Sequence, residues 1–114
     1  MNSKEIKGYF GEFLAIALLI LKGYRIVSHR YKTRLGEIDI VATKGNTIAF
    51  IEVKARNDYD KCFIAITSKQ LRRVQNASVI FLENHRQFSE YNLRYDVILV
   101  ANWNFPLHIK NVTM

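Results

Sequence analysis

The chain contains a single cysteine, Cys62, and a single proline among its 114 residues. One cysteine cannot supply a disulfide framework or a thiolate zinc site, so we expect a reduced, cytoplasmic setting. With so little proline and 49% hydrophobic residues, the sequence is neither disordered nor low in complexity. We find no internal repeat and no linker-like stretch, so residues 1–114 predict a single domain with one hydrophobic core.

Long apolar runs are also missing. The strongly apolar run from Phe13 to Leu21 is about half of the ~20 residues that a helix needs to span a bilayer. It follows the acidic residues Glu5 and Glu12 and lacks a small-residue cleavage site, unlike a signal peptide. The sequence therefore predicts a core helix here.

Acidic residues are few, since 10 Asp and Glu stand against 17 Lys and Arg and leave a net charge of +7. This excess favours a polyanionic partner, with nucleic acid ahead of an anionic membrane. An ordinary solubilising surface charge is the alternative explanation.

Apolar residues recur with a helical period from Ser3 to Lys22, and Gly23 is a natural stop. Because the second half of this helix is apolar nearly all round, we expect it to be buried against a sheet. A second helix is predicted from a capping box at Thr67 to about His85, and residues 57–66 predict a loop. Strands are predicted at 24–31, 36–42, 48–56, 95–101 and 107–112, the last at an edge. This order predicts an α/β domain with a mixed sheet and helices packed on it.

Two of these strands form a predicted hairpin around Gly45-Asn46, and both carry charges among apolar residues. If these two residues form the turn, Asp39 faces Glu52 and Glu37 faces Lys54. Two opposed carboxylates destabilise a sheet, and a divalent cation between them reverses that effect.

The charges on the second hairpin strand supply a possible chemistry. Glu52 and Lys54 share one face because alternate residues of a strand do so. Asp39 and Glu52 offer the oxygen ligands that Mg²⁺ prefers, and Lys54 could position a water or stabilise charge on a phosphate. The alternative is a weak surface ion pair. No Walker loop, dinucleotide glycine pattern, Ser-His-Asp arrangement or Cys/His metal spacing competes with this site, and the three histidines share no spacing.

Several sequence blocks resemble the YraN family of small bacterial proteins over roughly residues 8 to 101. The blocks are Gly11-Glu12-x-x-Ala15, Gly23-Tyr24-Arg25-Ile26-Val27, Gly36-Glu37-Ile38-Asp39 and Phe50-Ile51-Glu52-Val53-Lys54-x-Arg56, followed by Lys69, Ala77 and Arg94-Tyr95-Asp96-Val97-Ile98. The resemblance implies a restriction-endonuclease-like PD-(D/E)xK fold with an αβββαβ core, similar to archaeal Holliday junction resolvases.

The resemblance also implies roles for individual residues. Asp39 and Glu52 match the metal-binding acids, Lys54 the catalytic lysine, and Glu12 a helical acid that often completes the metal site. Without the resemblance, Glu12 is equally a solvated acid on the polar face of its helix. The cofactor implied is Mg²⁺ or Mn²⁺. Ile38 replaces the superfamily's proline before the aspartate, and Arg30 stands where family members often carry Asn.

The function implied is a metal-dependent nuclease that hydrolyses phosphodiester bonds, in DNA rather than RNA, either structure-specifically or nonspecifically. A non-catalytic module that binds nucleic acid or protein on the same fold is the alternative. Tyr31 and Tyr59 could stack on a base or be ordinary sheet residues. The edge strand at 107–112 could pair across a homodimer, and no membrane partner is expected. The basic residues expected to contact phosphates are Arg30, Lys32, Arg34, Arg56, Lys69, Arg72 and Arg73.

Overall fold

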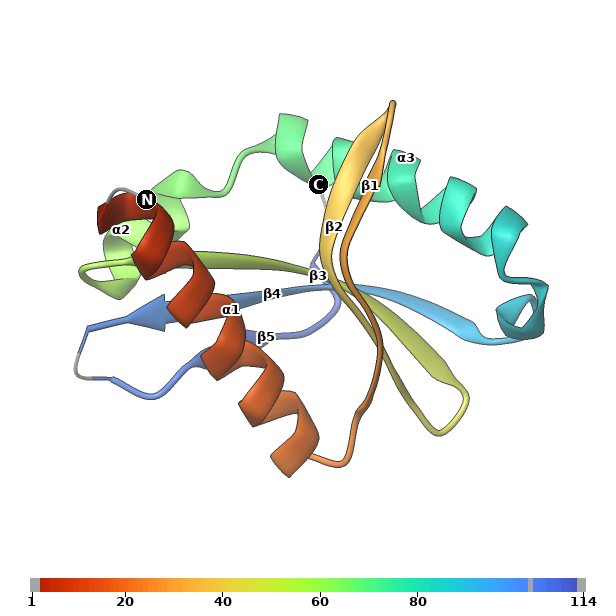
Figure 1. Cartoon of the computed structure of the whole chain (residues 1–114), viewed down its shortest axis with the longest axis horizontal. Helices are drawn as coiled ribbons and strands as arrows, with labels where there is room; N and C mark the ends of the chain where they lie inside the picture. The colour runs from red at the N-terminus through yellow and green to blue at the C-terminus, as the bar shows by residue number, and fades with distance from the viewer. Residues whose placement is uncertain (1–2, 103, 113–114) are drawn as a thin grey trace.

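The computed structural model describes residues 3–102 and 104–112, which form helices packed against a set of strands (Figure 1). The chain order contains the αβββαβ succession that the resemblance implies, with one short helix inserted and one strand added. The elements are α1 (Ser3–Leu21), β1 (Arg25–Thr33), β2 (Gly36–Lys44), β3 (Thr47–Arg56), α2 (Tyr59–Ala65), α3 (Ser68–Asn84), the 3₁₀ turn η1 (Arg86–Phe88), β4 (Asn92–Ala101) and β5 (Leu107–Ile109).

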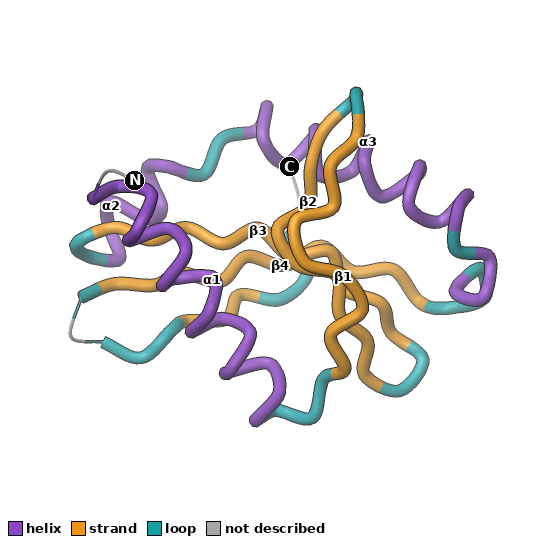
Figure 2. The backbone as a smooth tube through the Cα atoms, in the orientation of Figure 1, coloured by secondary structure: helices purple, strands orange, loops and turns teal. Residues whose placement is uncertain are grey.

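The strands form one mixed sheet in the order β1-β2-β3-β4-β5. Neighbours are antiparallel except β3 and β4, which are parallel and are connected through α2 and α3. Helix α1 covers one face of the sheet and α3 the other (Figures 1 and 2). The predicted α/β class is confirmed, and β5 is the edge strand that the sequence predicts.

Side-chain alternation along β3 divides the core between the two faces. Ile51 and Val53 pack in the same cluster as Leu19 of α1. Phe50 packs with Phe81 of α3, with ring centroids 5.9 Å apart. The central strand is therefore apolar on both faces, which is typical of a strand covered on both sides.

Helix α1 packs on the sheet as predicted, but only one side of it is buried although its second half is apolar nearly all round. Ala15 and Leu19 are fully buried, whereas Phe13, Ile20 and Leu21 are 66%, 58% and 85% exposed. A single helix on its face of the sheet presents only one side to the core, and no other described element covers its outer side. Among the described residues, no helix is long and apolar enough to cross a membrane.

The β2–β3 hairpin has the predicted turn, and Gly45 adopts a φ of 58°, the left-handed conformation that glycine tolerates. Pairing follows the predicted register from Lys44 with Thr47 up to Ile40 with Ile51. It ends there, so Asp39 with Glu52, and Glu37 with Lys54, are not ladder pairs. That part of the prediction is corrected by the separation of β2 from β3.

The segment between β3 and α3 contains a helix where the sequence predicts a loop. Asp58 caps α2, because its side chain accepts a hydrogen bond from the Lys61 backbone N–H at 2.8 Å. Only Cys62 of this seven-residue helix is fully buried, and so short an element shows little apolar period. The cap of α3 is confirmed, since Thr67 Oγ1 accepts from the Gln70 N–H at 3.1 Å.

The start of β2 lies directly against α3. A Cβ added at Gly36 would sit 2.1 Å from the backbone oxygen of Arg73. Only a residue without a side chain allows this approach, so Gly36 fixes the distance between the strand that carries Asp39 and the helix that carries Lys69.

Replacing Gly36 by Ala therefore forces β2 and α3 apart. We expect the free energy of unfolding to fall by about 1–3 kcal/mol, as for an overpacked core, measured by urea denaturation. The control is Gly45→Asn, because nothing lies within 4 Å of a Cβ there and Asn tolerates the left-handed conformation. Equal stability of Gly36→Ala and the wild type would contradict the close contact.

Candidate functional site

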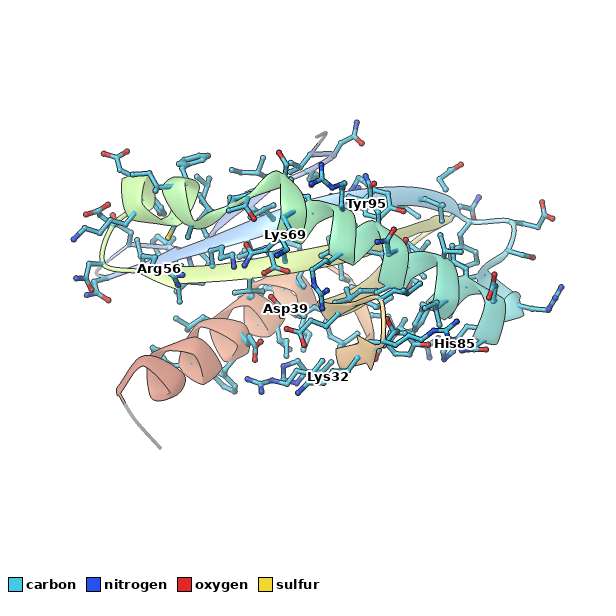
Figure 3. The ribbon with its side chains drawn as sticks, turned by 90° about the horizontal axis from the view of Figure 1, so that it is seen from above. Lys32, Asp39, Arg56, Lys69, His85 and Tyr95 are labelled. Carbon is cyan, nitrogen blue, oxygen red and sulfur yellow. The ribbon has the colours of Figure 1, made fainter. Side chains whose placement is uncertain are left out.

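Asp39 lies where β2 separates from β3. Its Oδ2 accepts a hydrogen bond from the backbone N–H of Val53 at 2.8 Å. The Asp39 side chain thus bonds to β3 just beyond Ile40 and Ile51, the last pair of the hairpin ladder. In Figure 3, Asp39 lies between Lys69 on one side and Lys32 on the other.

Glu52 and Lys54 flank Val53 on β3 and point to the same face of the strand. Lys54 Nζ lies 3.2 Å from Glu52 Oε1, and the two side chains are only 10% and 12% exposed. A weak surface ion pair would be far more exposed, so that alternative does not describe this arrangement.

The two carboxylates disturb one another electrostatically. Burial and the nearby charge of Glu52 raise the pKa of Asp39 to about 7, against the opposing hydrogen bond from Val53. Burial also raises the pKa of Glu52, while Lys54 acts to lower it. Acids held close together at some cost in stability are more typical of functional sites than of structural ones.

Glu12 approaches this pair from α1, and its charge contributes to the raised pKa values of both Asp39 and Glu52. Its Oε2 accepts hydrogen bonds from Arg30 Nη2 at 2.6 Å and Arg30 Nε at 2.9 Å. His29 Nε2 also lies 3.2 Å from that oxygen. The solvated-acid alternative is therefore excluded, since the Glu12 side chain is 12% exposed and doubly paired.

Arg30 reaches Glu12 from an unusual backbone conformation. Its φ is 59°, a left-handed value that is uncommon for residues other than Gly, Asn and Asp. The pairs His29–Ile40 and Tyr31–Ile38 place Arg30 across from Asp39 between β1 and β2. Asn, which the resemblance implies near this position, would tolerate the same conformation.

The donors fit a hard divalent cation in part. Asp39 and Glu52 supply two carboxylates, and Mg²⁺ is commonly held by one or two carboxylates with water at its other positions. Among the side chains that the structure describes, in residues 10–102 and 104–112, no three His, Cys, Asp or Glu are gathered closely enough to hold a metal ion. With its Oε2 already paired to Arg30, Glu12 would have to move to become a third ligand.

A polar hollow of about 230 Å³ opens beside Asp39. Its walls come from α1, β1 and β2 and include carboxylates as well as two of the predicted phosphate contacts. The lining residues are Glu12, Arg30, Lys32, Glu37, Ile38 and Asp39. Its mixed charge suits a ligand that brings both an anion and a cation.

The other predicted phosphate contacts lie on neighbouring elements. Lys69, Arg72 and Arg73 are exposed in the first two turns of α3, and Arg34 is exposed in the turn between β1 and β2. Arg56, at the end of β3, is partly exposed and donates to the Ala55 carbonyl oxygen at 2.7 Å.

The two tyrosines considered for base stacking belong to the core clusters. The Tyr31 ring meets Phe81 edge-on with centroids 5.0 Å apart. Tyr59 packs beside Cys62, and its hydroxyl donates to the backbone oxygen of Phe105. Tyr31 is thus the ordinary sheet residue of the alternative, whereas Tyr59 begins α2 and does not lie in the sheet.

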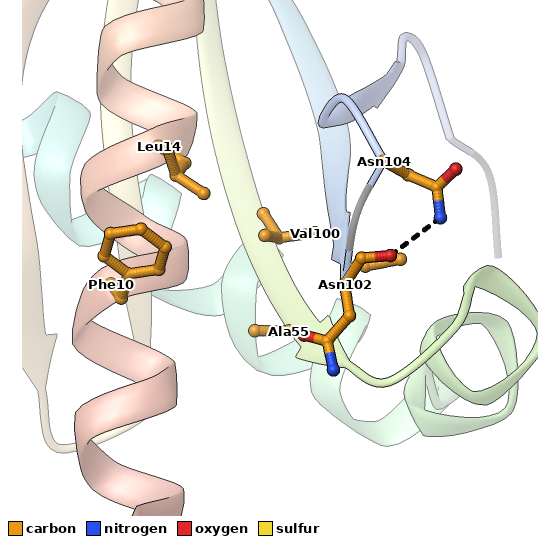
Figure 4. A pocket seen from close by; sticks show the side chains of 7 residues that line it. Phe10, Leu14, Ala55, Val100, Asn102 and Asn104 are labelled. Carbon is orange, nitrogen blue, oxygen red and sulfur yellow. Dashed lines mark hydrogen bonds between the residues drawn. The ribbon is translucent and has the colours of Figure 1, made fainter.

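A second, apolar hollow of about 380 Å³ lies between α1 and the ends of β3 and β4 (Figure 4). Phe10 and Leu14 line it from the helix, and Ala55 and Val100 from the sheet. No sequence motif predicts this hollow, because it forms between elements that are distant in the chain.

The raised pKa of Asp39 predicts a pH-dependent stability in a metal-free buffer with chelator. A folded-state pKa of about 7, above the ordinary 3.8, gives stability that is lost as pH rises toward 7. Asp39→Asn should therefore be more stable than the wild type at about pH 8, on the order of 2–3 kcal/mol, and should lose most of that advantage near pH 5. Glu90→Gln, at an exposed position, is the control. A stability difference independent of pH, measured by thermal denaturation, would refute the raised pKa.

The part of the chain that carries these residues is similar to known proteins. The model of the uncharacterised protein family UPF0102 matches residues 11–100, which include Glu12, Asp39, Glu52 and Lys54. A UPF0102 protein of Sinorhizobium medicae is 47% identical over 103 residues, covering 90% of this chain and 84% of the relative. A UPF0102 protein of Mesorhizobium japonicum is 40% identical over 105 residues, covering 92% and 84%, and one of a Chelativorans species is 41% identical over 106 residues, covering 93% and 86%. The chain therefore belongs to family UPF0102, the YraN family that its motifs resemble.

Proposed function

We propose that this protein is a metal-dependent nuclease that hydrolyses phosphodiester bonds in DNA. One observation carries the proposal: two carboxylates, Asp39 and Glu52, with raised pKa values stand beside a largely buried lysine, Lys54. Acids and a lysine so placed are costly for folding, and a bound divalent cation with a phosphate would offset that cost.

Asp39 and Glu52 would hold Mg²⁺ or Mn²⁺ through their oxygens, because these ions prefer carboxylate and water ligands. When bound, such an ion polarises a phosphoryl oxygen and lowers the pKa of a coordinated water. Glu12 would join the ligands if Arg30 turned its guanidinium to the substrate instead.

Lys54 would act on the phosphate directly. Its ammonium has three N–H donors, and Glu52 Oε1 lies 3.2 Å from Nζ. A remaining N–H can donate to a non-bridging phosphate oxygen, where it stabilises the negative charge that develops during attack, or can orient the attacking water. The hydrogen bond to Glu52 keeps Nζ in place in the absence of substrate.

The basic residues around the hollow would bind the nucleic-acid backbone. Arg30 and Lys32 line the hollow itself, while Lys69, Arg72 and Arg73 lie on the adjacent helix. Phosphate contacts position a duplex without reading its bases. A chain of 114 residues has little further surface for base recognition, so structure-specific or nonspecific cleavage is favoured over site-specific cutting.

The second candidate function is a nucleic-acid-binding module without turnover. The pairing of Glu12 with Arg30 and His29 favours it, because one oxygen of this acid is already engaged by two basic side chains. Both functions require DNA binding that weakens steeply with salt. Only the nuclease requires a metal site that depends on Glu52.

Calorimetric titration with Mn²⁺ separates the two functions. We expect the wild type to bind the ion and Glu52→Ala to lose binding, with Glu83→Ala, at an exposed acid on α3, as the matched control. Cleavage of branched, flapped and single-stranded DNA should then fall about 100-fold or more in Lys54→Ala. If the wild type binds no metal even with DNA present, the nuclease is excluded and the binding module stays.

The ion pair between Glu12 and Arg30 gives a further prediction. Arg30→Asn keeps a residue that tolerates the left-handed conformation and releases Glu12, so Mn²⁺ should bind more tightly. Arg34→Asn is the control for the lost charge alone. The gain should vanish in the double variant Glu12→Gln/Arg30→Asn. If the double variant keeps it, Glu12 is not a ligand.

A further inference from the structure

A second polar cluster lies at the end of α1 that is distant from Glu12. Its centre is Asp96 on β4, whose side chain has no exposed surface. Arg94 donates to both of its oxygens at 2.9 Å, His108 Nε2 lies 2.8 Å from Oδ2, and the backbone N–H of Asn111 donates to Oδ1 at 3.0 Å. The sequence predicts none of these contacts, because His108 has no characteristic spacing from another histidine or ligand residue.

Asp96 is a carboxylate whose acceptor positions are taken. Burial alone would raise its pKa, but the hydrogen bonds from His108, Arg94 and Asn111 outweigh burial and lower the pKa. Its negative charge offsets the positive charge of Arg94 and acts on Lys22 as well, and both of its oxygens already accept hydrogen bonds.

Three lysines surround this centre without a carboxylate of their own. Lys22 Nζ donates to His108 Nδ1 at 2.6 Å, and Lys44 Nζ lies 5.4 Å from the centre of the Tyr24 ring. Lys110 is close enough to Lys22 for their charges to repel. Among the described residues, none of the three lysines forms an ion pair with a carboxylate.

The cost of gathering these cations appears at Lys22. Burial and the repulsion from Lys110, Lys44 and Arg94 lower its pKa, and they outweigh the opposing charge of Asp96. The residues come from the end of α1, the hairpin turn, β4 and the end of β5, so folding itself assembles them. In Figure 1, the end of α1 and the β2–β3 turn lie on the side of the molecule away from α3.

We propose that Lys22, Lys44 and Lys110 form a second contact for the phosphate backbone of nucleic acid, remote from Asp39. The inference rests on the proposed function, because it extends the same ligand to another surface. A backbone phosphate supplies the negative charge that the cluster lacks, and the ammonium groups bind it as point charges without base recognition.

The separation of the two sites sets the length of nucleic acid that can reach both. Glu12 and Lys22 are ten residues apart on α1 and its last turn, which is about 15 Å at the helical rise. That is about four to five base-pair steps of 3.4 Å. A substrate must therefore extend beyond the cleavage point to engage the lysine cluster.

An anionic membrane is the competing occupant, since Ile20 and Leu21 beside the cluster are exposed. Helices that lie in a membrane surface carry Lys and Arg along their polar face. Between Phe10 and Leu21, α1 has no basic residue. The chemistry of the cluster thus favours phosphates of nucleic acid.

The salt dependence of DNA binding tests the inference. We compare the wild type with Lys44→Gln/Lys110→Gln, both at exposed positions, and with a charge-matched control, Lys61→Gln/Arg86→Gln, also exposed. Lys22 is left intact because it also bonds to His108. Each lost phosphate contact lowers the slope of log K against log salt by about 0.9 on duplex DNA. We expect a loss of about 1.8 for the Lys44/Lys110 variant and none for the control.

The outcomes are separable from those of the proposed function. If the wild type binds DNA and both double variants change its slope equally, the cluster is not a specific contact and the inference fails alone. Binding of anionic vesicles by the wild type, lost in Lys44→Gln/Lys110→Gln with an unchanged DNA slope, would assign the cluster to a membrane instead. If the wild type does not bind DNA at all, the proposed function fails and the inference with it. The metal binding that depends on Glu52 is a separate measurement, so its result does not depend on any of these three outcomes.

Discussion

The hydrogen bond from the Val53 N–H to Asp39 is the interaction on which the site depends. It is made where backbone pairing between β2 and β3 has just ended. A continuous ladder would have fixed Asp39 as one more strand residue. Because the two strands separate here, the Asp39 carboxylate instead turns toward β3. It lies near the carboxylate of Glu52, the residue that precedes Val53.

Folding must then tolerate like charges in a largely buried place. The opposing contributions come from apolar packing on both faces of the sheet and from Lys54, which partly neutralises Glu52. Ion pairs of this kind contribute little net stability once desolvation is included. The apolar core thus stabilises the fold, whereas the buried charges of the site lower its stability.

Two features of the backbone bring the basic residues close to the acids. Gly36 lets β2 touch α3, which carries the exposed Lys69 and Arg73. The left-handed backbone at Arg30 turns β1 so that its guanidinium reaches Glu12. Electropositive side chains therefore surround a small acidic centre, an arrangement suited to a polyanion bridged by a cation.

The sequence by itself determined much of the architecture. Helical period and capping chemistry place α1 and α3, the Gly45-Asn46 turn sets the hairpin register, and spacing alone puts Glu52 and Lys54 on one face. These features are local, so residue types and intervals suffice. The short helix α2 was missed because one buried residue gives no period.

Only the tertiary structure decided that Glu12 pairs with Arg30 and that the hairpin ladder ends at Ile40 and Ile51. It also decided that Asp96 contacts both His108 and Arg94, with three lysines nearby. The pKa of Asp39 likewise depends on burial and on a neighbour from another strand. Such properties arise from contacts between residues far apart in the chain, and Coulomb energies change with distance and burial rather than with sequence spacing.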